Sequence, residues 1–446
     1  KTLTIGNSAS IANGITFTNN GTIVNNGTFT NNNNNAAIGG TVKAGSGTII
    51  FNGTTILNPA ITTLTVDVPV TALTIDVPIG TIDSASSVGT LNVNKNAGVK
   101  AGATLTINTA AVIANSATLT NSGQITNSGT FLINGTFNNA SGTFINKNTL
   151  KHDGSGVIGG TVNANGVTAT FDGTTAANPA ITSLTVDAVL ATLNLKVAVT
   201  TLTVNAAVTT LDVSANIGTL IAGANITTLN NAKTAPATIS DLTVNNGVII
   251  ATLLNGTGTF VGVISDINVP AAGAGTITTL NMVNNAANTV SIPQDVAGTK
   301  LVITNLNVTG NSAAAISLAG TTTAKLEIGA MTIGDAVGGK LTGTAAFTLA
   351  GNITLGAAGI FSGTSGTYDA TEAAKLVLAQ KGVTASNTLT VAAGSNVACK
   401  FVKADGSSSP ASISATAAGI TSAVPLLYNT ASATPASGAN IFTVTY

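Results

Sequence analysis

A 17-residue string that occurs twice constrains this chain more than any other feature. The first copy, FNGTTILNPAITTLTVD, spans residues 51–67, and the second, FDGTTAANPAITSLTVD, spans residues 171–187; 13 of the 17 positions are identical. Both copies combine Thr, Val and Ile with Asn, Gly and Pro, a mixture typical of short strands joined by tight turns. Duplication of such a string predicts a fold that stacks similar β units.

Other matches show that the two copies differ by one insertion. Residues 2–5, TLTI, recur at 104–107 with an offset of 102, whereas residues 38–42, IGGTV, recur at 158–162 with an offset of 120. The second copy therefore contains 18 more residues between these points. In a solenoid, an insertion leaves the later strands in register only when it adds a whole coil. The insertion therefore predicts a coil of about 18 residues.

Two shorter periods agree with this coil length. In the Asn-rich part, glycines recur six, six and seven residues apart, and three such segments make about one coil. Elsewhere leucines recur every nine residues, and two such segments make one coil. The glycines are Gly123, Gly129, Gly135 and Gly142, and the leucines are Leu184, Leu193, Leu202, Leu211, Leu220 and Leu229. Since alternate residues of a strand face opposite sides, Leu and Val face one side and Thr the other.

These periods predict an all-β fold class: a parallel β-helix, or β-solenoid, of about 18 residues per coil, followed by a small C-terminal β-rich domain. Inward Leu, Ile, Val and Phe would stack into a core, with Thr outside. Asn and Gly tolerate left-handed backbone at the corners, and stacked Asn side chains can form hydrogen-bonded ladders. Because most positions are core, corner or Thr face, few are charged: 7% of residues, against about 25% in typical soluble domains.

We expect four segments along the chain. Residues 1–102 form the first β-solenoid repeat, and residues 103–230 form the second repeat with its extra coil. Residues 231–350, where the leucine spacing loosens, form an irregular β-solenoid or a transition. Residues 351–446 contain all three tyrosines and form a β-sandwich-like domain. One short helix is expected there at residues 370–381, because a capping residue precedes this stretch and Lys-Gly ends it.

The sequence offers few residues for catalysis or metal binding. His152 is the only histidine and Cys399 the only cysteine, so a Ser-His-Asp or Cys-His site has one candidate base. One His and one Cys cannot by themselves form a tetrahedral zinc site. His152 lies in the string KHDG and is interpreted as a solvated corner residue. Cys399 lies in VACKFV and is interpreted as a small buried apolar residue.

Carboxylate pairs matter because glycosidic bonds are commonly cleaved between two of them. Asp67 and Asp76 are nine residues apart, and their counterparts in the second copy are Asp187 and Lys196. The chain has no Trp to stack on a sugar, and all its basic residues are Lys. We interpret these four residues as corner residues. A carbohydrate-active β-helix enzyme is therefore only the third functional hypothesis, and we expect no enzymatic activity, no cofactor and no metal site.

The charge of the chain limits the classes of partner that it is expected to bind. Net charge is zero, whereas nucleic acids and anionic membranes are bound by clustered basic residues. No uncharged apolar run is long enough to span a bilayer. We therefore expect no nucleic-acid partner and no membrane span.

Nine Asn-X-Ser/Thr sequons occur, mostly as Asn-Gly-Thr, a string that turn chemistry also favours. If the source organism glycosylates exported proteins, these corners are expected to be accessible acceptors. They are Asn20, Asn26, Asn52, Asn134, Asn139, Asn225, Asn255, Asn307 and Asn352.

The strings GTIVNNGTFTNNN and TNSGQITNSGTFLINGTFNN resemble the repeats of secreted bacterial β-strand-repeat proteins. These are the haemagglutinin-like adhesins and the surface-layer or filament proteins with β-solenoid shafts. The resemblance covers roughly residues 1–230. It implies an exported protein, located at the cell surface or outside the cell.

The preferred hypothesis is a structural subunit of a self-assembling extracellular filament or surface layer. A β-helix has open strand edges unless it is capped, and such edges favour head-to-tail pairing between copies of the chain. The expected assembly residues are Thr2, Leu3, Thr4, Ile5, Phe442, Val444 and Tyr446. The alternative is a cell-surface adhesin whose shaft presents the C-terminal domain to a carbohydrate or host surface.

Overall fold

In a computed structural model, the chain divides into two compact units, Lys1–Ala206 and Ala207–Tyr446. It describes residues 1–11, 17–32, 37–54, 57–174, 179–257, 260, 262–270, 273–284, 288–292, 299–310, 316–320, 326–333, 339–343, 347–349, 353–355, 359–363, 367–370, 376–378, 387–391, 396–397, 412–413, 424–425, 427–428 and 442–445.

The regular elements of unit 1 are strands. They are β1 (Thr2–Ile5), β2 (Ser8–Ile11), β3 (Thr22–Asn25), β4 (Thr28–Asn31), β5 (Thr41–Ala44), β6 (Thr48–Asn52), β7 (Ile61–Val66), β8 (Val70–Ile75), β9 (Ile79–Val93), β10 (Ala97–Val99), β11 (Thr104–Ile113), β12 (Thr118–Asn121), β13 (Gln124–Asn127), β14 (Thr130–Ile133), β15 (Thr136–Asn138), β16 (Thr143–Asn146), β17 (Thr149–His152), β18 (Thr161–Ala164), β19 (Thr168–Asp172), β20 (Ile181–Val186), β21 (Leu190–Leu195) and β22 (Val199–Val204).

The regular elements of unit 2 are strands as well. They are β23 (Val208–Val213), β24 (Ile217–Ala222), β25 (Ile226–Asn231), β26 (Ala237–Val244), β27 (Ile249–Asn255), β28 (Gly262–Asn268), β29 (Gly273–Asn284), β30 (Asn288–Ile292), β31 (Thr299–Gly310), β32 (Ile316–Gly320), β33 (Leu326–Ile333), β34 (Gly339–Gly343), β35 (Phe347–Leu349), β36 (Ile353–Leu355), β37 (Gly359–Gly363), β38 (Thr367–Ala370), β39 (Leu376–Leu378), β40 (Asn387–Val391), β41 (Asn396–Val397), β42 (Ser412–Ile413), β43 (Val424–Pro425), β44 (Leu427–Tyr428) and β45 (Phe442–Thr445).

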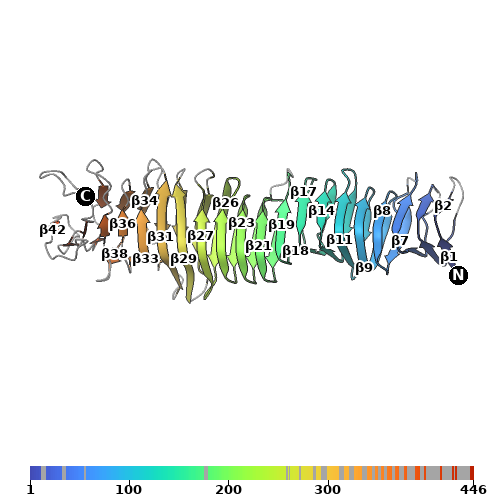
Figure 1. Cartoon of the computed structure of the whole chain (residues 1–446), viewed down its shortest axis with the longest axis horizontal. Helices are drawn as coiled ribbons and strands as arrows, with labels where there is room; N and C mark the ends of the chain where they lie inside the picture. The colour runs from blue at the N-terminus through green and yellow to red at the C-terminus, as the bar shows by residue number, and fades with distance from the viewer. Residues whose placement is uncertain are drawn as a thin grey trace. The chain divides into compact units, whose positions relative to one another are not determined.

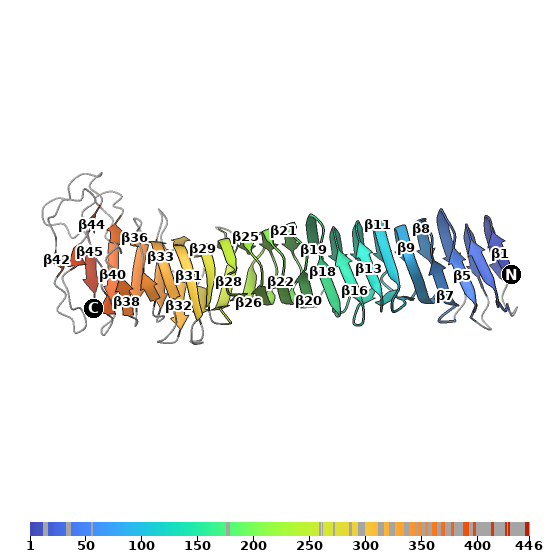
Figure 2. The same ribbon diagram turned by 90° about the horizontal axis from the view of Figure 1, so that it is seen from below.

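In unit 1 the strands stack in three columns, and each strand pairs in parallel with the strand of the next coil. The first column runs through β1, β3, β5, β7, the start of β9, β10, β12 and β15. The second runs through β2, β4, β6, β8, the end of β9, β11, β14, β17, β19 and β21. The third begins in the middle of β9 and runs through β11, β13, β16, β18, β20 and β22. Figures 1 and 2 show this order from two sides.

Unit 2 stacks its strands in the same parallel manner. One column contains β23, β25, β27, β29, β31 and β33, and another contains β24, β26, β28, β30, β32, β34, β37, β40 and β45. An antiparallel pair is formed by β42 and β43. The predicted all-β fold class, with its parallel β-solenoid, is confirmed for both units.

The predicted coil length of 18 residues holds in the regular part of unit 1. Hydrogen-bonded side chains of successive coils, such as Thr63 and Thr81 or Asp187 and Asn205, are 18 residues apart. In unit 2 the coil becomes longer, and the bond from Asn307 to Asn281 spans 26 residues. Within unit 2 the strands lengthen as well, from six residues in β23 to 12 residues each in β29 and β31.

The two copies of the repeated string make equivalent strand pairings in unit 1, although β7 belongs to the first column and β20 to the third. In the first copy, Phe51 of β6 pairs with Ile75 of β8, and in the second, Phe171 of β19 pairs with Leu195 of β21. Isolated bridges also match, since Ile38 pairs with Ile61 as Ile158 pairs with Ile181. The internal repeat predicted from the sequence is therefore confirmed in three dimensions.

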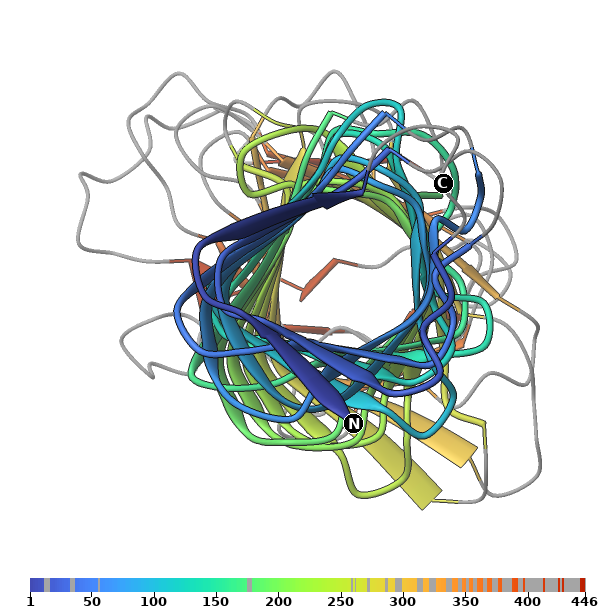
Figure 3. The same cartoon turned by 90° about the vertical axis from the view of Figure 1, so that its right-hand side faces the viewer.

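Rows of apolar side chains fill the interior of unit 1, which the strands surround in the view along the stack (Figure 3). In β20, Ile181, Leu184 and Val186 are fully buried, and Leu184 pairs with Leu202 of the next coil. Leu193 of β21 is also buried but belongs to the second column, which explains the nine-residue leucine period. Burying each such side chain contributes about 1.5–3 kcal/mol.

Inward asparagines occupy several of the corners where the period is six residues instead of nine. Asn127 is fully buried; its Oδ1 accepts a hydrogen bond from the Gly129 N–H at 3.2 Å, and its Nδ2 donates to the Gly129 carbonyl at 3.0 Å. The same Nδ2 donates to Asn146 Oδ1 at 2.9 Å and to the Thr149 carbonyl at 3.0 Å in the next coil. The Asn127 amide thus provides hydrogen-bond partners for backbone groups that a sharp corner would otherwise leave unpaired. The predicted asparagine ladders are confirmed.

The helix expected at residues 370–381 is wrong for part of that range. Residues Leu376–Leu378 form strand β39, which pairs in parallel with β36 and β44. The expectation rested on a capping residue and a Lys-Gly end, which are weak local signals. The strand instead follows the parallel pairing of the neighbouring coils, a case of tertiary context overriding local propensity.

Candidate functional site

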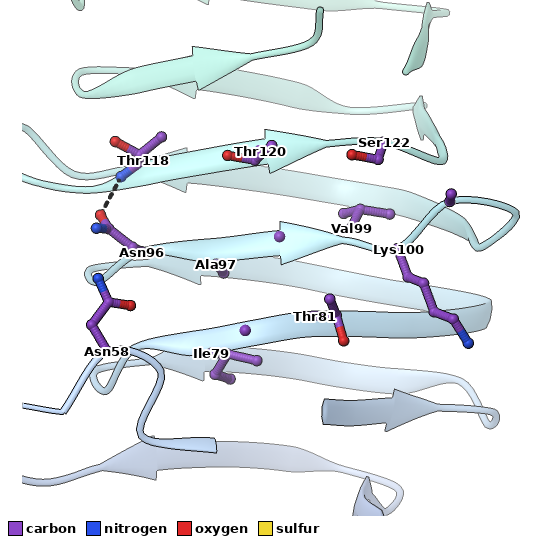
Figure 4. Close-up of a pocket in the computed structure, with 13 residues that line it drawn as sticks. Asn58, Ile79, Thr81, Asn96, Ala97, Val99, Lys100, Thr118, Thr120 and Ser122 are labelled. Carbon is purple, nitrogen blue, oxygen red and sulfur yellow. Dashed lines mark hydrogen bonds between the residues drawn. The ribbon is translucent and has the colours of Figure 1, made fainter. Parts of the chain in front are cut away.

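A trough with a volume of about 590 Å³ lies over β10 in unit 1 (Figure 4). β10 has three residues; Ala97 and Val99 face inward and are buried, so only Gly98 faces out. Thr81 of β9 and Thr120 of β12 carry side chains on the outer face on either side. The trough is therefore one strand wide, because the central strand has no outward side chain.

Polar side chains close the two ends of the trough. At one end, Asn96 Oδ1 accepts a hydrogen bond from the Thr118 N–H at 2.9 Å (Figure 4). At the other end, Lys100 Nζ lies 2.6 Å from Asp83 Oδ2. Lys100 is the only titratable residue among those lining the trough, and it is already paired. The trough can offer hydroxyl and amide groups to a ligand, but it contains no candidate base or nucleophile with a partner to activate it.

The floor of the trough is set by backbone packing. A Cβ atom placed on Gly98 would lie 2.8 Å from the carbonyl oxygen of Gly80 in the neighbouring coil, too close for any side chain. Gly80 is itself restricted, since its Cβ would lie 2.7 Å from the Thr62 carbonyl oxygen. These glycines are therefore required by the close approach of successive strands, and they do not by themselves indicate a ligand.

The aspartates that the sequence singled out are not brought together. Asp67 follows β7 in the first column, and its Oδ2 lies 2.6 Å from Lys43 Nζ. Asp76 follows β8 in the second column, and its Oδ1 accepts a hydrogen bond from Asn94 Nδ2 at 2.7 Å. Each carboxylate is bound to the neighbouring coil of its own column, as a structural residue would be.

Their counterparts in the second copy behave in the same way. Asp187 accepts a hydrogen bond from Asn205 at 2.9 Å, and Lys196 Nζ lies 3.1 Å from Asp172 Oδ2. Within the part of the chain that the structure describes, no three His, Cys, Asp or Glu side chains gather where they could hold a metal ion.

His152 is not the solvated corner residue expected from the sequence; that interpretation is wrong. The side chain is 1% exposed at the end of β17 and pairs in register with Ile133 of β14. Its Nε2–H donates to the Gly156 carbonyl at 3.1 Å, and its buried Nδ1 has no partner. Burial lowers the pKa of His152, against smaller opposing effects of the Gly156 bond and of Asp153.

Charged residues flank His152 on the outside of the coil. Lys151 Nζ lies 2.7 Å from Asp153 Oδ2. The hydrogen bond from Lys151 is the main reason why the pKa of Asp153 lies below its usual range, and the same contact raises the pKa of Lys151. Thr174 of the next coil adds two bonds to Asp153, from its N–H at 2.8 Å and from its hydroxyl at 3.0 Å.

The predicted assembly strands each have one partner in the part of the chain that the structure describes. Thr2, Leu3, Thr4 and Ile5 form β1, which pairs with β3. Ile5 is buried, whereas 53% of Leu3 is exposed beside a hollow of about 410 Å³. Phe442 and Val444 belong to β45, which pairs with β40. Tyr446 lies outside the described residues.

The nine sequons differ in exposure. The side chains of Asn20, Asn26, Asn52 and Asn225 are exposed, and those of Asn134 and Asn307 are half-buried. The expectation of accessible acceptors is wrong for Asn139 and Asn255, which are fully buried in the folded chain. Asn139 donates to the Gly159 carbonyl at 2.9 Å, and Asn255 accepts from Asn231 at 2.8 Å. Asn352 and the cysteine Cys399 lie outside the described residues.

Comparisons of the chain with protein-family models, with curated protein sequences and with solved structures give no match. Over the described residues, no helix has the length and apolar character needed to cross a lipid bilayer. The resemblance to adhesins and surface-layer proteins therefore stays an expectation from the sequence.

Proposed function

We propose that the chain is a structural subunit of an extracellular filament or surface layer, which polymerises through open β-strand edges. One observation supports this proposal: asparagine and aspartate side chains of the described coils bond to side chains of a neighbouring coil. Asn127 bonds to Asn146, and Asp67 bonds to Lys43. A binding or catalytic site would instead leave such groups directed toward a ligand.

The stacked Asp and Asn side chains of successive coils also support a structural role. Stacking places equivalent residues of successive coils about 4.8 Å apart, so two aspartates in one column would repel. At several positions the chain places Asn above Asp, as in the pairs Asp76–Asn94 and Asp187–Asn205 in unit 1, although Asp241 and Asp266 of unit 2 are in register with each other. In unit 2 the pair Asp212–Asn230 repeats this arrangement, with 2.5 Å between the bonded atoms. These bonds favour continued stacking of coils.

The β1 edge provides a surface for adding one more coil. The Thr22 N–H donates to the Lys1 carbonyl and the Asn26 N–H to the Ile5 carbonyl, which fixes the side of β1 that faces β3. Because bonding residues alternate along a parallel strand, the N–H and C=O groups of Thr2 and Thr4 point away from β3. Such outward groups bind an added strand by β-augmentation. A strand of a second copy, for which β45 is the candidate, would pair there.

This geometry allows a test that changes one N–H group. Replacing Thr4→Pro removes an outward donor without removing a bond to β3, since proline is tolerated where its nitrogen faces away from a pairing partner. Thr4→Val keeps the N–H and serves as the matched control. We expect the wild type and Thr4→Val to sediment as polymers and Thr4→Pro to sediment as a monomer.

The outcome that contradicts the proposal is polymerisation of all three proteins to the same extent. Circular dichroism is the folding control. A folded Thr4→Pro variant should give the spectrum of the wild type, whereas unfolded protein would give a different one.

A further inference from the structure

His152 occupies a corner position that other coils fill with asparagine. The string 149–154, TLKHDG, has the same spacing as 124–129, QITNSG, in which Asn127 is the inward corner residue. Like Asn127, His152 is the last residue of its strand and is buried. Unlike an amide, an imidazole can change its charge near neutral pH.

The first copy of the repeat contains the same corner without a titratable group. Asn32 Oδ1 accepts bonds from the N–H and hydroxyl of Thr54 at 2.9 and 3.1 Å, just as Asp153 accepts two bonds from Thr174. This match makes Asn31 the counterpart of His152. Asn31 is also fully buried, and its Nδ2 donates to the Ala60 carbonyl at 3.2 Å.

The hydrogen bond of His152 fixes which ring nitrogen carries the proton in the neutral form. The Gly156 carbonyl can only accept, so Nε2 carries the proton and Nδ1 carries a lone pair. Nδ1 is buried and has no partner. A proton taken up from solvent at Nδ1 would create a buried N–H without an acceptor and a buried positive charge, both of which disfavour the closed corner.

The carboxylates around the ring are already paired with lysines, so Asp153 offsets only part of the cost of that charge. On its own coil, Asp153 is paired with Lys151, and in the next coil Asp172 is paired with Lys196. In the preceding coil the register partner is Ile133, and the residues of β14 are uncharged. The ring is therefore held among apolar groups and ion pairs that are already formed.

We propose that residues 149–156 form an acid-sensitive corner, closed while His152 is neutral and opened when the ring takes up a proton at Nδ1. Because burial lowers the pKa of His152 in the folded chain, stability is unaffected well above the ordinary value of about 6.5. It falls as the pH drops below that value, where the open form binds one proton more than the closed form.

Hydrogen exchange of the full-length chain tests this proposal, because the chain has a single histidine. Between pH 6.5 and pH 5, after correction for intrinsic rates, we expect protection of peptides covering 149–156 to fall steadily, by at most about tenfold per pH unit because one proton is taken up. Peptides covering 28–32, which contain the Asn31 corner, should keep constant protection and serve as the internal control.

The variant His152→Asn installs the residue found at the counterpart corner. We expect its protection at 149–156 to be independent of pH in the same range, and the same for His152→Gln. The readout is the slope with pH, which a constant loss of stability in either variant does not change. A flat profile in the wild type, or the same slope in the two variants, would overturn the proposal.

Discussion

An inward asparagine stabilises several of the six-residue corners of this chain, whereas buried Ile133 occupies the same kind of corner between β14 and β15. Asn127 uses its amide to bond the backbone of its own corner and the side chain of the next coil. At equivalent positions of the nine-residue segments, such as Val186, the inward residue is apolar and three residues, 187–189, connect the strand to β21. The inward asparagine therefore adds hydrogen bonds within and between coils that an apolar residue at the same position cannot form.

Replacing Asn127→Ala is expected to destabilise the chain, because it leaves the Thr149 carbonyl and the Gly129 backbone groups buried without their amide partner. An unsatisfied buried polar group costs about 1–3 kcal/mol. The control is Asn205→Ala, which also removes a bond between coils but at an exposed site. We expect that change to cost less than about 1 kcal/mol. Urea unfolding measures both variants, and equal effects would contradict the importance assigned to burial.

The side-chain chemistry at residue scale was only partly predictable. Spacing alone predicted the inward leucines and the asparagine ladders, because periodicity determines which residues share a face. It did not predict that His152 is buried, because histidine in a polar string is usually solvated. The available signal was the alignment of KHDG with TNSG, which places the ring in an inward slot.

At the scale of elements, the repeating unit is a whole coil. The length of a coil varies because the connections between its strands vary in length. The strands β7 and β8 together with their turns make one coil of unit 1, and the strands above and below have the same inward pattern. A whole coil can therefore be removed without changing which strand lies in which column.

Deletion of residues 61–78, which contain β7 and β8, is expected to leave a folded protein. Ile79 would then take the place of Ile61, and Val88 that of Val70, since these pairs are already in register. Deletion of residues 61–69 alone removes a strand from one column only and should abolish cooperative folding. Thermal melts followed by circular dichroism compare the two. Equal melting behaviour of the two deletions would show that the coil is not the unit of stability.

The spacing of the strands followed from the sequence wherever the period was regular, as in residues 61–75 and 181–204. Prediction failed at β39, within the expected helix, because a short stretch of helix-forming residues competes with pairing to neighbouring strands. The trough over β10 was also not predicted. It lies over a strand whose only outward residue is Gly98, and the register shift there, which pairs Val99 with Ile82 while Ala97 pairs with Ile79, is not revealed by any sequence period.

At the scale of the whole molecule, composition and fold agree. A chain with 7% charged residues and no net charge has little electrostatic repulsion between copies, which favours association. Each unit is a parallel β-solenoid, and the coil formed by β1 and β2 has pairing groups directed away from β3 and β4. A head-to-tail contact of this kind does not close on itself and leads to a fibre.

The assembly state of the wild-type chain tests the central claim most directly. Negative-stain electron microscopy of the purified protein, over a range of concentrations, should show filaments or sheets whose amount rises with concentration. Fibre diffraction from the same sample should show a reflection near about 4.8 Å along the filament axis, because the coils continue from one subunit to the next. Monodisperse single particles at every concentration would contradict the proposal that the chain is a self-assembling structural subunit.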